Sequence, residues 1–131
     1  MNSVLPDTNV LIDLFTGGRD FERELSSADR ILVTPTVVGE FLAGVRNSAR
    51  DAVRRQAFES FLDDPVVELV VHDRETGIYY ASVHRFLKDA GTPIPQNDVW
   101  IAASALQHGA TVLTRDSHFA DIPILPSVVL P

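Results

Sequence analysis

The chain contains no cysteine. Disulfide bonds, thiolate metal ligands and cysteine nucleophiles are therefore excluded, and a reducing cytoplasm is compatible with the sequence. The chain also lacks any run of about 18 apolar residues, and its amino terminus has no basic segment followed by a long apolar stretch. These absences predict a soluble, unprocessed cytoplasmic protein that does not cross a membrane.

Basic residues are scarce as well. Lysine and arginine together number 11 against 18 aspartates and glutamates, which gives a formal net charge of −7. Nucleic-acid binding usually draws on clustered Lys and Arg, so this balance taken alone argues against such a partner. Part of the acidic excess could instead be metal ligands whose charge a bound cation cancels. The plainer interpretation is that the acids keep the surface soluble.

The length and apolar content predict a single domain over residues 1–131. A chain of 131 residues with 45% hydrophobic residues has enough apolar material to bury one continuous core. No repeat, low-complexity tract or linker divides the chain. We therefore expect one functional site.

Short apolar runs alternate with helix-forming segments along the whole chain. The predicted strands are 3–6, 31–33, 66–71, 111–113 and an edge strand at 124–125. The predicted helices follow Asp7, cover 20–27, and run over 35–46, 49–62, 74–90 and 98–108, the last of them capped by Asn97. Strands that alternate with helices predict an α/β fold with a mainly parallel central sheet covered on both faces.

Four acidic residues fall where the predicted parallel strands end, which is where open α/β sheets bind ligands. Asp7 ends the first strand, and Glu40 lies about one and a half turns into the helix after the second. The last helix travels about 17 Å away from Asp98, and the strand that follows returns about as far to Asp116. We therefore expect Asp7, Glu40, Asp98 and Asp116 to be neighbours in space.

Carboxylates packed so closely repel one another unless a cation compensates their charge. Mg²⁺ and Mn²⁺ prefer oxygen ligands, and such ions can activate water and stabilise the oxygens of a phosphodiester. Thr114 faces the same end of the sheet, where it can orient a carboxylate or a water molecule. This combination predicts a divalent-metal site that hydrolyses a nucleic-acid backbone, with RNA the favoured substrate.

Each acid also has an ordinary structural explanation when it is taken singly. Asp7 and Asp98 are typical of helix caps or first-turn acids, and Asp116 is typical of a turn. Glu40 has the position of a solvated helix residue. Because these explanations do not predict four acids at one end of one sheet, the shared site is favoured.

Four motifs in order resemble those of the PIN-domain family, and in particular the VapC-type toxins of prokaryotic toxin–antitoxin pairs. They are DTNVLID at 7–13, Gly39 and Glu40 with Gly44, DVWIAA at 98–103, and LTRDSHF at 113–119. The resemblance covers essentially the whole chain. In the family the first acid is a metal ligand that the polar residue two positions later supports, and this role falls to Asn9.

The resemblance implies a three-layer α/β/α fold and a Mg²⁺- or Mn²⁺-dependent endoribonuclease whose catalytic ligands are the four acids. It also implies a homodimer and a VapB-like antitoxin protein whose tail blocks the site. On this interpretation the protein cleaves RNA and is the toxin of the pair.

Two other classes of protein place acids at strand ends. A phosphatase of the haloacid dehalogenase type would need a second Asp where Asn9 stands, and a receiver domain would need a late lysine, whereas Lys88 is the only lysine. A PIN-like module that binds RNA or protein without cutting is the remaining alternative. The presence of all four acids argues against it.

Two further features of the sequence leave alternatives open. His118, near Asp116, has the position of a substrate contact or of a turn cap. The densest basic stretch is compatible with phosphate binding, with an acidic partner or with a solvated helical face. Its members are Arg46, Arg50, Arg54 and Arg55.

Overall fold

A five-stranded parallel sheet forms the centre of the molecule in the computed structural model, which describes residues 1–46 and 48–131. Its strands lie in the order β3-β2-β1-β4-β5. The elements in chain order are β1 (Ser3–Pro6), α1 (Thr8–Phe15), α2 (Glu22–Ser26), β2 (Arg30–Val33), α3 (Pro35–Ala43), α4 (Ala49–Leu62), β3 (Val67–Leu69), α5 (Arg74–Ala90), α6 (Gln96–His108), β4 (Thr111–Thr114), the 3-10 helix η1 (Ser117–Asp121) and β5 (Ser127–Val129).

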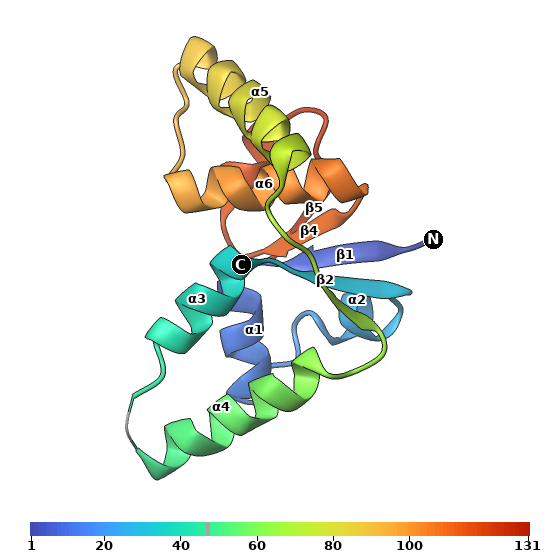
Figure 1. The fold of residues 1–131 in the computed structure, drawn as a ribbon, viewed down its shortest axis with the longest axis vertical. Helices are drawn as coiled ribbons and strands as arrows, with labels where there is room; N and C mark the ends of the chain where they lie inside the picture. Colours follow the sequence, from blue (N-terminus) through green and yellow to red (C-terminus); the bar gives the residue numbers. More distant parts are fainter. Residues whose placement is uncertain (47) are drawn as a thin grey trace.

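Helices cover both faces of this sheet, so the predicted α/β class is confirmed (Figure 1). In Figure 1, α5 and α6 lie on one side of the strands, and α1, α3 and α4 lie on the other. Every residue of β1 is buried, and its side chains alternate between two apolar clusters, with Val4 in one and Leu5 in the other. A strand that is buried on both faces reads as a continuous apolar run, as this one does.

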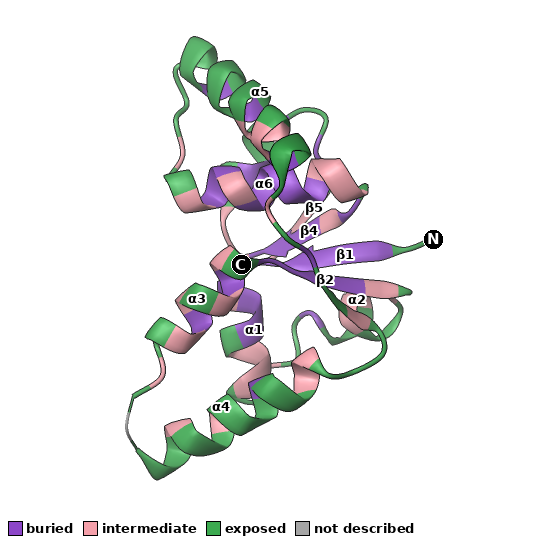
Figure 2. Ribbon diagram, in the orientation of Figure 1, coloured by how far each residue is buried: buried purple, intermediate pink, exposed green. Residues whose placement is uncertain are grey.

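The buried residues gather where the strands meet α6 and α1, while the outer surfaces of α4 and α5 are exposed (Figure 2). Phe58 of α4 is fully buried and stacks on Phe41 of α3, with ring centroids 4.0 Å apart. The ring of Phe15 packs edge-on against both of these phenylalanines. This aromatic cluster fixes α3 against α1, and α3 is the helix that carries Glu40.

Helices α5 and α6 end at glycines, as the sequence predicts. Gly91 and Gly109 follow α5 and α6 with φ angles of 73° and 64°, a left-handed conformation that glycine adopts without a Cβ penalty. Asp73 caps α5 in a reciprocal capping box with Thr76. Among the helices that the structure describes, none combines the length and apolar character needed to span a membrane.

Two local predictions are wrong. Asn97 does not cap the last helix, because that helix begins at Gln96 after Pro95, and the Asn97 amide reaches Glu40 instead. The edge strand is not at 124–125 but at Ser127–Val129. Leu125 is buried in a turn, where its N–H donates to the carbonyl of Ile122. Prolines on both sides of 124–125 lack the N–H that a strand ladder needs, and pairing with β4 therefore begins beyond them.

Candidate active site

The candidate site lies at the carboxyl ends of β1 and β4, which are neighbours in the sheet. Asp7 follows β1 directly, and its backbone N–H donates to the carbonyl of Leu113 across a distance of 2.8 Å. All four predicted acids line one open surface pocket there, together with six other residues. The pocket is lined by Asp7, Thr8, Asn9, Ile12, Glu40, Pro95, Asn97, Asp98, Asp116 and His118.

Asp7 is buried and held by three neutral donors. Its carboxylate accepts hydrogen bonds from the Thr114 hydroxyl at 2.9 Å, the Thr8 backbone N–H at 2.8 Å and the Asn9 amide at 3.3 Å. Burial raises the pKa of Asp7 to about 6, against the lowering effect of the Thr114 and Thr8 hydrogen bonds. The nearby charges of Asp98 and Asp116 make a smaller contribution to the same rise. Thr114 and Asn9, expected as supporting residues, thus both contact Asp7.

Glu40 is fixed through both of its carboxylate oxygens. The Thr8 hydroxyl donates to Oε1 and the Asn97 amide donates to Oε2, each across 2.8 Å. These donors come from α1 and α6, so the side chain is held between two helices. Neither Thr8 nor Asn97 is predicted as a site residue from the sequence, although they are direct neighbours of Asp7 and Asp98.

Asp98 and Asp116 approach each other beside His118. Asp98 is only 5% exposed, and its Oδ2 lies 3.5 Å from the Nδ1 atom of His118. One ligand atom from each of Asp98, Asp116 and His118 lies within 4.8 Å of the others. Burial raises the pKa of Asp98, the His118 imidazole opposes this shift, and the charges of Asp116 and Glu40 add to it.

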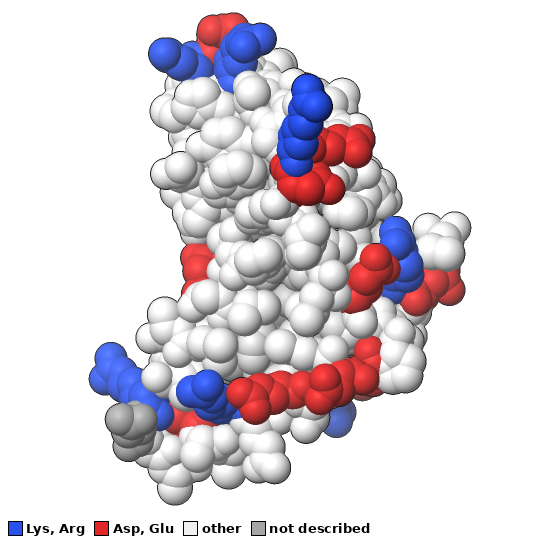
Figure 3. All heavy atoms as spheres, viewed as in Figure 1, with Lys and Arg blue, Asp and Glu red and all other residues white. Residues whose placement is uncertain are grey.

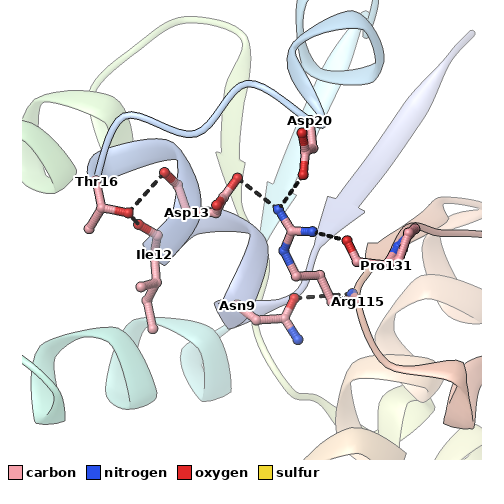
Figure 4. A network of polar contacts seen from close by, with 7 residues as sticks. All are labelled: Asn9, Ile12, Asp13, Thr16, Asp20, Arg115 and Pro131. Carbon is pink, nitrogen blue, oxygen red and sulfur yellow. Dashed lines mark hydrogen bonds and ion pairs between the residues drawn. The ribbon is translucent and has the colours of Figure 1, made fainter.

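Arg115 follows β4 directly, and its side chain links the end of this strand to α1 beside the pocket (Figure 4). Its guanidinium lies 3.0 Å from Asp13 and 2.9 Å from Asp20, and it also donates to the carbonyl of Pro131. The Arg115 backbone N–H donates to Asn9 Oδ1 at 3.3 Å. Because the oxygen end of the Asn9 amide is held in this way, its NH₂ end faces Asp7.

The donor set of the pocket fits a hard divalent cation. Its four carboxylates offer the oxygen ligands that Mg²⁺ and Mn²⁺ prefer. The donors that hold Asp7 and Glu40 are all uncharged, so they orient these carboxylates without neutralising them. The negative charge therefore remains available to an ion from solution.

The fold and the pocket define a class: a parallel α/β protein with four carboxylates gathered at the carboxyl edge of its sheet. The particular family follows from the sequence match. The chain belongs to the PIN domain family, whose pattern it matches over residues 4–125. The resemblance carried by the four motifs is thereby confirmed.

Three similar proteins match the chain over most of its length. Ribonuclease VapC5 of Mycobacterium tuberculosis (strain H37Rv) is 29% identical over 125 residues, which are 93% of this chain and 89% of that protein. The crystal structure of VapBC2 from Rickettsia felis bound to a promoter DNA fragment contains a chain that superimposes with a TM-score of 0.83 at 22% identity, with 97% and 98% of the chains covered. The VapBC-5 structure from Mycobacterium tuberculosis gives a TM-score of 0.74 at 26% identity, with 99% and 98% covered.

Proposed function

We propose that the protein is a divalent-metal-dependent endoribonuclease and the toxin of a VapBC-type toxin–antitoxin pair. One observation carries this proposal: four carboxylates line a single pocket, and the donors that orient Asp7 and Glu40 are uncharged. A folded chain gathers such charges at a cost in stability unless a cation offsets their repulsion. The similarity to a protein named as a VapC ribonuclease supports RNA as the substrate.

In this proposal Asp7, Glu40, Asp98 and Asp116 hold Mg²⁺ or Mn²⁺. When bound, such an ion supplies Lewis-acid catalysis, making water more acidic and stabilising charge on the phosphoryl oxygens. The chain's own residues set the geometry of the ligands. Asn9 and Thr114 hold the Asp7 carboxylate, and both Glu40 oxygens are held from α1 and α6. Such support limits the reorganisation required during the reaction.

The charge distribution gives an RNA strand two places to anchor. In Figure 3, Lys and Arg atoms lie over one end of α5 and near the tip where α3 connects to α4, in both places beside Asp and Glu atoms, and a small acidic area lies at the waist between them. Within the basic stretch, Arg54 pairs with Asp51 and Arg55 pairs with Glu59. The exposed Arg46 and Arg50 are therefore the members we assign to phosphate contact.

The same proposal includes a cognate VapB-like antitoxin, a homodimer and a cytoplasmic location. Solved relatives carry the name of the VapBC family of toxin–antitoxin systems, which supports a protein partner. A second, largely apolar pocket formed by α1, α3 and α4 adjoins the acidic one, and the half-exposed Ile12 lines both. An antitoxin tail lying along the apolar pocket would reach the carboxylates and block the site.

A module that binds RNA or protein without cutting it is the second candidate. It would need the fold and the surface but not an oriented set of ligands. The hydrogen bonds that hold both oxygens of Glu40 favour the enzyme, because mere binding of a nucleic acid gains nothing from a fixed carboxylate.

We expect the purified protein, freed of any partner, to cleave RNA in Mg²⁺ or Mn²⁺ and to stop when EDTA is added. The reason is that four carboxylates line the proposed site, and the chemistry proposed there depends on an ion that they hold. Gel analysis of a labelled RNA before chelation, after chelation and after restoring excess Mn²⁺ would follow this directly. A Glu40→Gln preparation is the control for contaminating nucleases. Cleavage that continues in EDTA with the parent, but is absent from the Glu40→Gln preparation, would refute the metal mechanism.

A further inference from the structure

His118 is the one nitrogen-bearing side chain among the possible metal-ion ligands grouped with Asp98 in the described part of the chain. We propose that His118 supplies a nitrogen ligand to a divalent cation shared with Asp98 and Asp116, and that it thereby favours Mn²⁺ over Mg²⁺. This inference rests on the proposed function because it concerns the same pocket. The four-carboxylate site by itself contains only oxygen ligands and predicts no such preference.

The distance between His118 and Asp98 suits two ligands of one ion. Nδ1 of His118 lies 3.5 Å from Oδ2 of Asp98, whereas a charge-assisted N–H···O hydrogen bond is typically about 2.7–2.9 Å long. Ligand atoms that each lie about 2.0–2.2 Å from a metal, at angles near 90° to 110°, are about 3.0–3.5 Å apart. The observed separation falls at the long end of that range.

The hydrogen bonding of Asp98 also points to a missing ligand. Asp98 is only 5% exposed and lines the pocket, yet no hydroxyl, amide or backbone N–H from residues 1–46 or 48–131 donates to its carboxylate. Asp7, which is buried to the same degree, receives three such donors. Among the described residues the imidazole of His118 is thus the one donor near the Asp98 carboxylate, and a cation held between Asp98, Asp116 and His118 would offset the charge of the two buried or half-buried carboxylates.

The chemistry of the ligand set leads to the ion preference. Mg²⁺ favours oxygen ligands and gives up its waters reluctantly, so an imidazole adds little to its binding. Mn²⁺ is also suited to carboxylate ligands, but as the first member of the first-row transition series it binds imidazole more readily than Mg²⁺ does, although less strongly than the later ions of that series. Mn²⁺ can therefore use all three side chains, whereas Mg²⁺ can use only the two carboxylates well.

Pulsed electron paramagnetic resonance of Mn²⁺ bound to the full chain tests this at about pH 8, where an ordinary imidazole is neutral. We expect modulation from a directly bound nitrogen in the parent, and a changed pattern when the histidines carry ¹⁵N. The signal should persist in His84→Ala, which removes an exposed histidine of α5 outside the acidic pocket, and vanish in His118→Ala. Labelling the parent keeps the test decisive even if the His118 variant folds poorly.

Titrations with Mn²⁺ alone and Mg²⁺ alone complete the test. His118→Ala should weaken Mn²⁺ binding about tenfold or more, the loss typical when a group that supports a metal site is removed. Its Mg²⁺ affinity should change by less than about threefold. Bound Mn²⁺ with only oxygen ligands, in a parent that still cleaves RNA, would overturn the role of His118 and leave the proposed function standing. A parent that binds neither ion would overturn both.

Discussion

Asp98→Asn should abolish RNA cleavage while leaving the metal-free fold at least as stable as the parent. Asp98 is buried, and burial followed by the charges of Asp116 and Glu40 raises its pKa. The substitution removes one of the repelling charges but preserves the shape of the side chain. It also removes no cap, because Pro95 occupies the N-cap position of α6. We expect a rate loss on the order of a thousandfold, comparable to removing a key electrostatic contact.

Thermal unfolding with and without metal separates this role from a structural one. At 100 times its dissociation constant, a cation that binds only the folded parent adds about 2.7 kcal/mol of stability, and Asp98→Asn should gain much less. Asp89→Asn, at the exposed end of α5, is the matched control and should respond to metal as the parent does. A variant that unfolds readily in EDTA yet gains full stabilisation from Mn²⁺ would show that Asp98 is structural.

Asp7→Asn should lose cleavage as well, and it should stabilise the metal-free protein by an amount that grows with pH. The pKa of Asp7 rises from 3.8 to about 6 on folding, chiefly through burial. A carboxyl group with a raised folded pKa favours the folded state fully below its unfolded pKa, and this contribution is lost as pH rises through the folded value. The parent should therefore lose up to about 3 kcal/mol of stability between about pH 4 and pH 7.

Denaturant unfolding of parent and Asp7→Asn in metal-free buffer from pH 4 to 8 measures this effect as a difference. The free energies of unfolding of the two proteins should be nearly equal at pH 4, and that of the variant should be higher at neutral pH. Added Mn²⁺ should stabilise the parent and so reduce the difference in free energy of unfolding between the two proteins. A difference that stays constant across the pH range would mean that the Asp7 carboxylate is not destabilised by its surroundings.

The sheet and the positions of the four acids could be predicted because both follow from local pattern and simple geometry. Parallel strands that are buried on both faces appear in the sequence as apolar runs. Because α6 and the segment from β4 to Asp116 have similar lengths, the chain returns to the end of the sheet at which α6 begins. Asp98 and Asp116 meet for that reason. The ends of α5 and α6 were predictable because Gly91 and Gly109 adopt a backbone conformation that other residues disfavour.

The contacts that hold the carboxylates could not be predicted, because they join elements far apart in the chain. Asn97 has the sequence signature of a helix cap, yet the packing of α3 against α6 brings Glu40 within its reach. Arg115 binds Asp13 and Asp20 only once β4 lies beside α1. The basic stretch illustrates the same limit, since the pairing of Arg54 and Arg55 within α4 depends on side-chain placement.

The most direct test of the central claim is to measure RNA cleavage and Mn²⁺ occupancy in the same samples, starting from metal-free protein. If the four carboxylates form the catalytic metal site, the single-turnover rate should rise from zero in proportion to the bound Mn²⁺ and level off when the site is full. Asp98→Asn should show neither the binding nor the rate at those concentrations. Cleavage that is already maximal before Mn²⁺ binds, or that follows Mn²⁺ equally in Asp98→Asn, would contradict the account.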